Sequence, residues 1–178
     1  MEEKVNVWTA NFTNGLILAL VGIVYSLVMY FLDLTLNKVQ SYIFLVIMLV
    51  ILYLLLKSYR DNFKHGLITY GESVGAGVII SLYYVLIMAV FTYILYTIID
   101  PGLITKQLAQ AEEAMRAKGN LTDGQIEAGM KFTEKIMKPG MMVIISVFFG
   151  MLWATIISLL VSIFIKKEGN PLIDTPAN

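Results

Sequence analysis

The sequence contains no cysteine, so it forms no disulfide bond and offers no thiolate for catalysis or metal binding. Charge is also scarce, since 15% of its 178 residues are Asp, Glu, Lys or Arg, against about 25% in an ordinary soluble domain. The 13 basic residues balance 13 acidic ones, so the chain has no excess of positive charge to indicate a nucleic-acid partner. Apolar residues dominate instead and make up 58% of the chain.

Four long runs of the sequence carry no charged side chain. They cover residues 11–32, 39–56, 73–99 and 140–165. A helix of about 20 residues crosses the hydrocarbon core of a bilayer, and helices satisfy their own backbone polar groups there. The alternative, core helices of a soluble bundle, requires polar faces that residues 39–56 almost lack. We therefore predict an all-α polytopic protein, a single membrane domain over residues 1–178 with four transmembrane helices and the lipid bilayer as its surroundings.

The distribution of Lys and Arg predicts the orientation of these spans. Six basic residues flank one side of the predicted membrane, namely Lys4, Lys57, Arg60, Lys64, Lys166 and Lys167, whereas the short loop on the other side has only Lys38. Basic residues favour the cytoplasmic side, which predicts cytoplasmic N- and C-termini in a bacterial inner membrane. Three lysines just before the last span, at positions 131, 135 and 138, count against this orientation.

The long connection between the third and fourth spans is expected to form an extramembrane helical hairpin over residues 103–138. Thr105 is expected to cap its first helix, and Thr122 with Gln125 matches the capping-box pattern for its second. The apolar faces of the two helices are expected to be Leu108, Ala111 and Met115, and Ile126, Met130, Phe132, Ile136 and Met137. The hairpin either docks a partner or packs with its apolar face on the bundle or in the lipid headgroups.

Small residues recur at helical spacing within the spans, where close packing drives helix association. They are Ser146, Gly150, Ala154, Ser158 and Ser162 in the last span, and Gly15, Ala19, Gly22 and Ser26 in the first. The third span opens with Gly71, Gly75, Gly77 and Ser81. Packing seams within one chain are the simpler interpretation, and a seam that faces a second copy is the alternative. Trp153, in the middle of the last span, is expected to pack in the core, because its indole N–H needs an acceptor.

Three polar residues are candidates for a functional site: Glu72, Asp33 and His65. Glu72 opens the third span, where the helix dipole alone would favour a carboxylate, and a proton or cation site is the functional alternative. Asp33 ends the first span. His65 is the sole histidine, and a metal site would need further ligands such as Asp61 and Glu72, so no metal or other cofactor is expected. No catalytic motif is recognisable, and we expect the chain not to be an enzyme.

Three short segments stand out in order along the chain: Asn14-Gly15, Tyr59-Arg60-Asp61-Asn62 and residues 66–72, which lead into a glycine-containing third helix. In these residues the chain resembles a bacterial membrane family known only as domain of unknown function 4199. The resemblance implies four helices in a bacterial inner membrane and assigns no activity or catalytic residue.

Three functional hypotheses follow. The first is a non-enzymatic accessory or scaffold protein that binds a protein partner. The second is a small transporter or lipid-handling protein that works as a homodimer. The third is a membrane-embedded enzyme that uses Glu72, Asp33 or His65.

Overall fold

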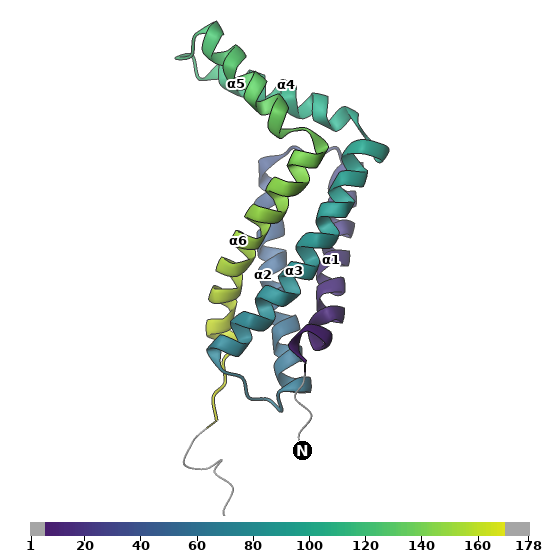
Figure 1. Cartoon of the computed structure of the whole chain (residues 1–178), viewed down its shortest axis with the longest axis vertical. Coiled ribbons are helices and arrows are strands. Elements are labelled where there is room, and N and C mark those ends of the chain that lie inside the picture. Colours follow the sequence, from purple (N-terminus) through teal and green to yellow (C-terminus); the bar gives the residue numbers. More distant parts are fainter. Residues whose placement is uncertain (1–5, 170–178) are drawn as a thin grey trace, which may run out of the picture. The chain divides into compact units, whose positions relative to one another are not determined.

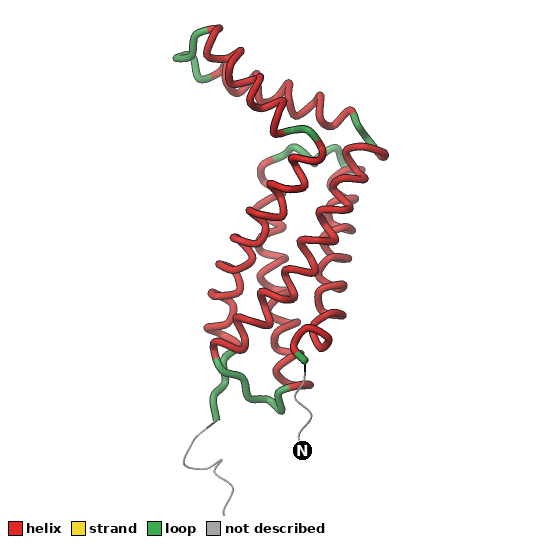
Figure 2. The backbone as a smooth tube through the Cα atoms, in the orientation of Figure 1, coloured by secondary structure: helices red, strands yellow, loops and turns green. Residues whose placement is uncertain are grey.

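The computed structural model describes residues 6–169, and nearly all of them are helical (Figure 2). Within this range there is no strand, and the only extended pairing is an isolated antiparallel bridge between Ile68 and Lys167. The prediction of an all-α chain is therefore confirmed. Lys4, which contributed to the predicted orientation, lies outside the described residues.

Four helices are long and apolar enough to cross a membrane: α1 (Val7–Phe31), α2 (Lys38–Phe63), α3 (Tyr70–Ile94) and α6 (Pro139–Ile165). Each covers most or all of one predicted span, so the predicted number of membrane-length helices is confirmed. α3 continues into a short π-helical stretch, η1 (Leu95–Ile99), which completes the predicted third span. α2 extends beyond its apolar run, because helix-compatible polar residues follow Leu56.

The described residues divide into two compact units. One, which we call the bundle unit, contains residues 6–87 and 150–169, and the other, the connection unit, contains residues 88–149. In the bundle unit, α1 and the first part of α3 run in one direction, while α2 and the last part of α6 run in the other (Figure 1). Its core joins all four helices through fully buried side chains such as Leu18, Leu52, Ile80 and Ile157.

The connection unit contains α4 (Gly102–Ala117) and α5 (Asp123–Ile136), which pack on each other; we call them the α4–α5 pair. Met115 faces Gly129 across this contact, and Ile126 and Thr133 are buried. Phe132, which was expected among the apolar residues of α5, is 65% exposed.

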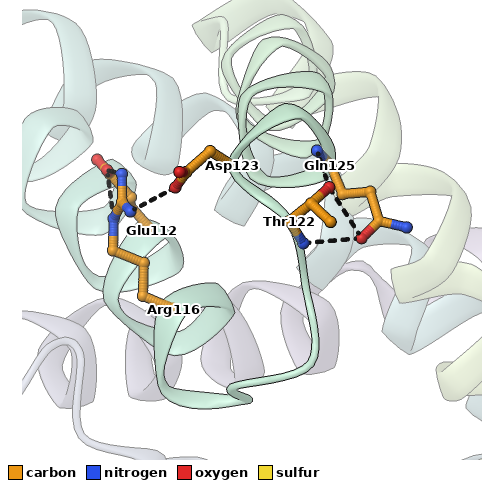
Figure 3. Close-up of polar contacts among 5 residues, drawn as sticks. All are labelled: Glu112, Arg116, Thr122, Asp123 and Gln125. Atoms are coloured by element: carbon orange, nitrogen blue, oxygen red, sulfur yellow. Dashed lines mark hydrogen bonds and ion pairs between the residues drawn. The ribbon is translucent and has the colours of Figure 1, made fainter.

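The caps of the α4–α5 pair show one correct and one wrong prediction. Thr122 and Gln125 form the predicted capping box at the start of α5 (Figure 3). Thr105, in contrast, does not cap α4, because the helix already begins at Gly102, whose N–H donates to Asp100 Oδ1. The Asp100-Pro101-Gly102 turn supplies both the end of one helix and the start of the next.

Candidate functional site

Glu72 lies in the first turn of α3, and both of its carboxylate oxygens have partners. Oε1 accepts a hydrogen bond from Lys64 Nζ at 2.6 Å. Oε2 accepts from the backbone N–H of Thr69 at 3.0 Å and from its hydroxyl at 2.9 Å. The N–H of Glu72 in turn donates to Thr69 Oγ1 at 3.3 Å. This reciprocal arrangement is a capping box, which satisfies backbone donors at the start of a helix.

The capping box gives Glu72 a structural role that the sequence analysis missed. Thr69 and Glu72 have the Thr-x-x-Glu spacing of a capping box, the same signal that located the cap of α5. The ion pair with Lys64 adds little stability, because both side chains are partly exposed and water screens their attraction. The hydrogen bond to Glu72 raises the pKa of the Lys64 ammonium, which keeps this lysine charged beside the carboxylate.

Two further contacts tie the same end of the bundle unit together. Ile68 and Lys167 exchange backbone hydrogen bonds of 2.9 and 3.0 Å, which join the segment before α3 to the segment after α6. Arg60, in the last turn of α2, donates through Nη1 to the carbonyl of Ile165 at 3.1 Å. A cation at the C-terminus of a helix satisfies an unpaired carbonyl and complements the helix dipole. Arg60 therefore links α2 to the end of α6.

A shallow depression of about 330 Å³ lies beside these contacts. It is lined by Leu67, Ile68, Thr69, Glu72, Lys167, Glu168 and Gly169. Its polar groups include Glu72, whose two oxygens are engaged in the cap and the ion pair, and the paired backbone of Ile68 and Lys167. We interpret this end of the bundle unit as a structural junction of three chain segments.

The structure does not bring Asp33, His65 and Glu72 together. Asp33 precedes α2 and His65 follows it, so the 26 residues of this helix separate them by about 39 Å at 1.5 Å per residue. Both residues have positive φ, 54° for Asp33 and 51° for His65, as residues in tight turns between helices do. Within residues 6–169, no three His, Asp or Glu side chains are grouped so that they could hold a metal ion.

The small residues of α6 lie against those of α3 in a regular antiparallel register. Ser162 and Ser73 form a buried hydrogen bond of 2.9 Å between their hydroxyls. One step of four residues along each helix, a Cβ placed on Gly77 would lie 2.8 Å from Ser158 Oγ. Ala154 and Ser81 occupy the next step of this register, and both are buried.

The fourth step of this register reverses the roles of the two helices. Here the small residue belongs to α6, since a Cβ on Gly150 would lie 3.2 Å from Val85 Cγ2. We call this whole contact, from Ser73–Ser162 to Val85–Gly150, the α3–α6 seam. Ser146 is exposed, and its hydroxyl donates to the carbonyl of Val143 on its own helix.

The small residues of α1 also face the chain itself. Gly15 is buried and contacts the side chain of Tyr83 on α3, which leaves no room for a Cβ. Ala19 and Gly22 are buried as well, whereas Ser26 is half-buried. The expectation for Trp153 was wrong, because its side chain is 60% exposed on the outside of α6. In hydrocarbon an apolar ring is stable on the outer surface, so burial is not required for it.

Together these observations define a class of protein: an all-helical chain with four membrane-length apolar helices and a small-residue seam inside the bundle. The chain belongs to the family described as "Protein of unknown function (DUF4199)", whose model matches residues 13–167. The family resemblance inferred from residues 14–15, 59–62 and 66–72 is thereby confirmed. No curated protein and no solved structure matches the chain.

Proposed function

We propose that the chain is a non-enzymatic accessory or scaffold protein that docks a partner protein through the α4–α5 pair. In this proposal it resides in a bacterial inner membrane with cytoplasmic termini, and the α4–α5 pair lies outside the bilayer on the opposite side. The distribution of Lys and Arg around the spans supports this orientation.

The observation that carries the proposal is the engagement of Glu72, the sharpest candidate for chemistry, in a helix cap and an ion pair. The serines at the inner end of the α3–α6 seam likewise bond to each other. In contrast, the α4–α5 pair presents charged side chains to solvent, including Glu113 and Glu134. Because Glu72 and these serines are engaged in structural contacts, the charged side chains of the α4–α5 pair are the better candidates for recognising a partner.

The α4–α5 pair is also braced in a way that suits docking. Arg116 on α4 bonds to Glu112 at 2.8 Å and to Asp123 on α5 at 3.4 Å (Figure 3). Of these two contacts, the one between Arg116 and Asp123 joins the two helices, and as an exposed pair it contributes little energy. A surface that is ordered before binding loses less conformational entropy on association.

Site-specific photocrosslinking in native membranes tests this proposal. A crosslinking residue replaces exposed Glu113 on α4, and the matched control replaces exposed Leu160 on the outer face of α6. We expect one discrete protein adduct from position 113 and none from position 160, together with loss of the partner's complex when the chain is deleted. Adducts of position 113 with lipid or with the chain alone, and no effect of deletion, would contradict the proposal.

The second candidate is a dimeric transporter or lipid-handling protein. Its supporting observation is the pair of buried hydroxyl oxygens of Ser81 and Ser158, neither of which has a hydrogen-bond partner. Such hydroxyls would suit a polar path, although a helix can satisfy them through its own carbonyls. Lipid or solute transfer by the purified chain in sealed vesicles, abolished by Ser158→Ala, would favour this candidate over docking.

A further inference from the structure

The outer face of α5 carries a large exposed apolar side chain that the packing of α4 and α5 leaves uncovered. Phe132 is 65% exposed, whereas Ile126 and Thr133 on the inner face are buried. The inner face is occupied, since Gly129 contacts Met115 of α4. Contact with α4 therefore leaves the side chain of Phe132 uncovered.

Charges on α5 are segregated around Phe132. At 3.6 residues per turn, Lys135 lies about 60° and Lys131 about 100° from Phe132 around the helix axis. The three acidic residues of the helix, Asp123, Glu127 and Glu134, lie between about 140° and 180° from it. Both lysines lie on the same side of the phenyl ring, away from Gly129 and Thr133, and the negative charge lies on the opposite side of the helix from Phe132.

Not all of this positive charge is available. Lys131 forms an ion pair of 2.8 Å with Glu127, which directs its ammonium away from the phenyl ring. Lys135 and Lys138 are both exposed. They are the two cations that remain to meet an anionic partner beside Phe132.

The chain keeps this face close to the start of α6. Phe132 precedes Pro139, the first residue of α6, by seven residues within the same compact unit. Even fully extended, seven residues span at most about 25 Å, so Phe132 stays within reach of the bilayer surface. Apolar residues flanked by lysine are typical of helices that lie in the headgroup layer.

We propose that the outer face of α5 rests on the anionic headgroups of the membrane from which α6 emerges. Phe132 inserts among the headgroups and upper acyl chains, while Lys135 and Lys138 contact lipid phosphates. This surface would hold the α4–α5 pair at the bilayer and leave α4 exposed to a partner. The lysines before α6 counted against the predicted orientation. Contact with lipid phosphates gives Lys135 and Lys138 a role other than setting topology.

The absence of cysteine from the sequence makes the test direct. A single Phe132→Cys variant is labelled with an environment-sensitive nitrobenzoxadiazole fluorophore and reconstituted in nanodiscs, either of phosphatidylcholine alone or with phosphatidylglycerol added. The matched control is Glu134→Cys, on the opposite side of the same helix. Quenching by aqueous iodide and by spin-labelled lipid reports where each label lies.

We expect the label at position 132 to be shielded from iodide and quenched by spin-labelled lipid when phosphatidylglycerol is present. Each of Lys135→Gln and Lys138→Gln should weaken this partition by about fivefold. The label at position 134 should stay accessible to iodide in both lipids. Equal iodide quenching at 132 and 134, or protection that is the same in both lipids, would overturn the proposal.

Salt provides a second measurement that needs no lysine variant. Raising ionic strength screens lysine–phosphate attraction, so shielding at position 132 should fall as salt is added. Shielding that ignores salt, or that appears only when a membrane protein extract is added, would indicate a protein occupant and overturn the proposal. The fluorescence experiment uses the purified chain without a partner, so a negative result there does not bear on the docking proposal. A negative crosslinking result likewise does not bear on the proposed contact of α5 with lipid.

Discussion

Replacing Gly77 with alanine places one methyl group directly in the α3–α6 seam. The added Cβ would lie 2.8 Å from Ser158 Oγ, 3.0 Å from Ser158 Cβ and 3.4 Å from Leu56 Cδ1. Ser158 Oγ can rotate away, but its Cβ is attached to the backbone of α6, so the two helices must separate by a few tenths of an ångström. Overpacking of this kind destabilises a folded protein by about 1–3 kcal/mol.

Gly75→Ala is the matched control for this variant. Gly75 lies on the same helix, and a Cβ there would meet no atom within 4 Å. Both substitutions change helix propensity in the same way, so their difference isolates the contact with α6. Unfolding by sodium dodecyl sulfate in mixed micelles, followed by circular dichroism, gives the free energy of unfolding of each.

A double-mutant cycle completes the test. Ser158→Gly removes the two atoms closest to the new methyl group, so Gly77→Ala should cost about 1–3 kcal/mol less in the Ser158→Gly background. If Gly77→Ala is as stable as Gly75→Ala, or if Ser158→Gly gives no relief, the close approach of α3 and α6 at this step is refuted.

Four other substitutions address the junction and the α4–α5 pair. Thr69→Ala removes the cap of α3 and should cost about 1 kcal/mol in the same unfolding assay. Glu72→Gln keeps an acceptor and loses only a screened ion pair, so it should cost less than about 1 kcal/mol. A larger loss for Glu72→Gln would contradict the capping role. Arg60→Met leaves the carbonyl of Ile165 without its charged donor. This loss should cost about 1–3 kcal/mol of unfolding free energy and speed hydrogen exchange at the end of α6. Unchanged exchange would argue against the cap. Thr122→Ala breaks the capping box of α5 and should lower the free energy of unfolding by about 1 kcal/mol, with hydrogen exchange rising in the first turn of α5 and not in α2.

The four membrane-length helices were predictable because their signal is local. A run of about 20 uncharged residues identifies such a helix whatever it packs against. The ends of the helices were less predictable, since α2 continues to Phe63, well past the last residue of its apolar run, through residues that are polar but helix-compatible. The start of α4 was misplaced because a cap had been expected at Thr105, whereas the helix begins at Gly102, whose N–H donates to Asp100 Oδ1.

The partners of the candidate residues were not predictable in the same way. The spacing of Ser158 and Ser162 shows that one face of a helix is small, but it does not say which helix lies against it. The structure supplies α3 as that neighbour through Gly77 and Ser73. Similarly, the ion pair of Glu72 depends on how the segment after α2 folds back, whereas its capping box could have been found from the Thr69 spacing alone.

Trp153 shows a limit of sequence patterns. In a soluble helix, a large aromatic residue that is exposed is unusual, and burial is the natural expectation. Next to lipid this expectation fails, because the outside of the molecule is itself apolar. Trp153 is 60% exposed, and the information missing from the sequence pattern is the nature of the surrounding solvent.

The central claim is that the apolar helices cross a membrane and place the α4–α5 pair and the α2–α3 connection on opposite sides. Single cysteines at His65 and at Lys118, in a chain with no other thiol, can be labelled with an impermeant maleimide in intact and in permeabilised spheroplasts. We predict that one position reacts in intact spheroplasts, Lys118→Cys by the proposed orientation, and that the other reacts only after permeabilisation. Equal labelling of both positions in intact spheroplasts would contradict the account.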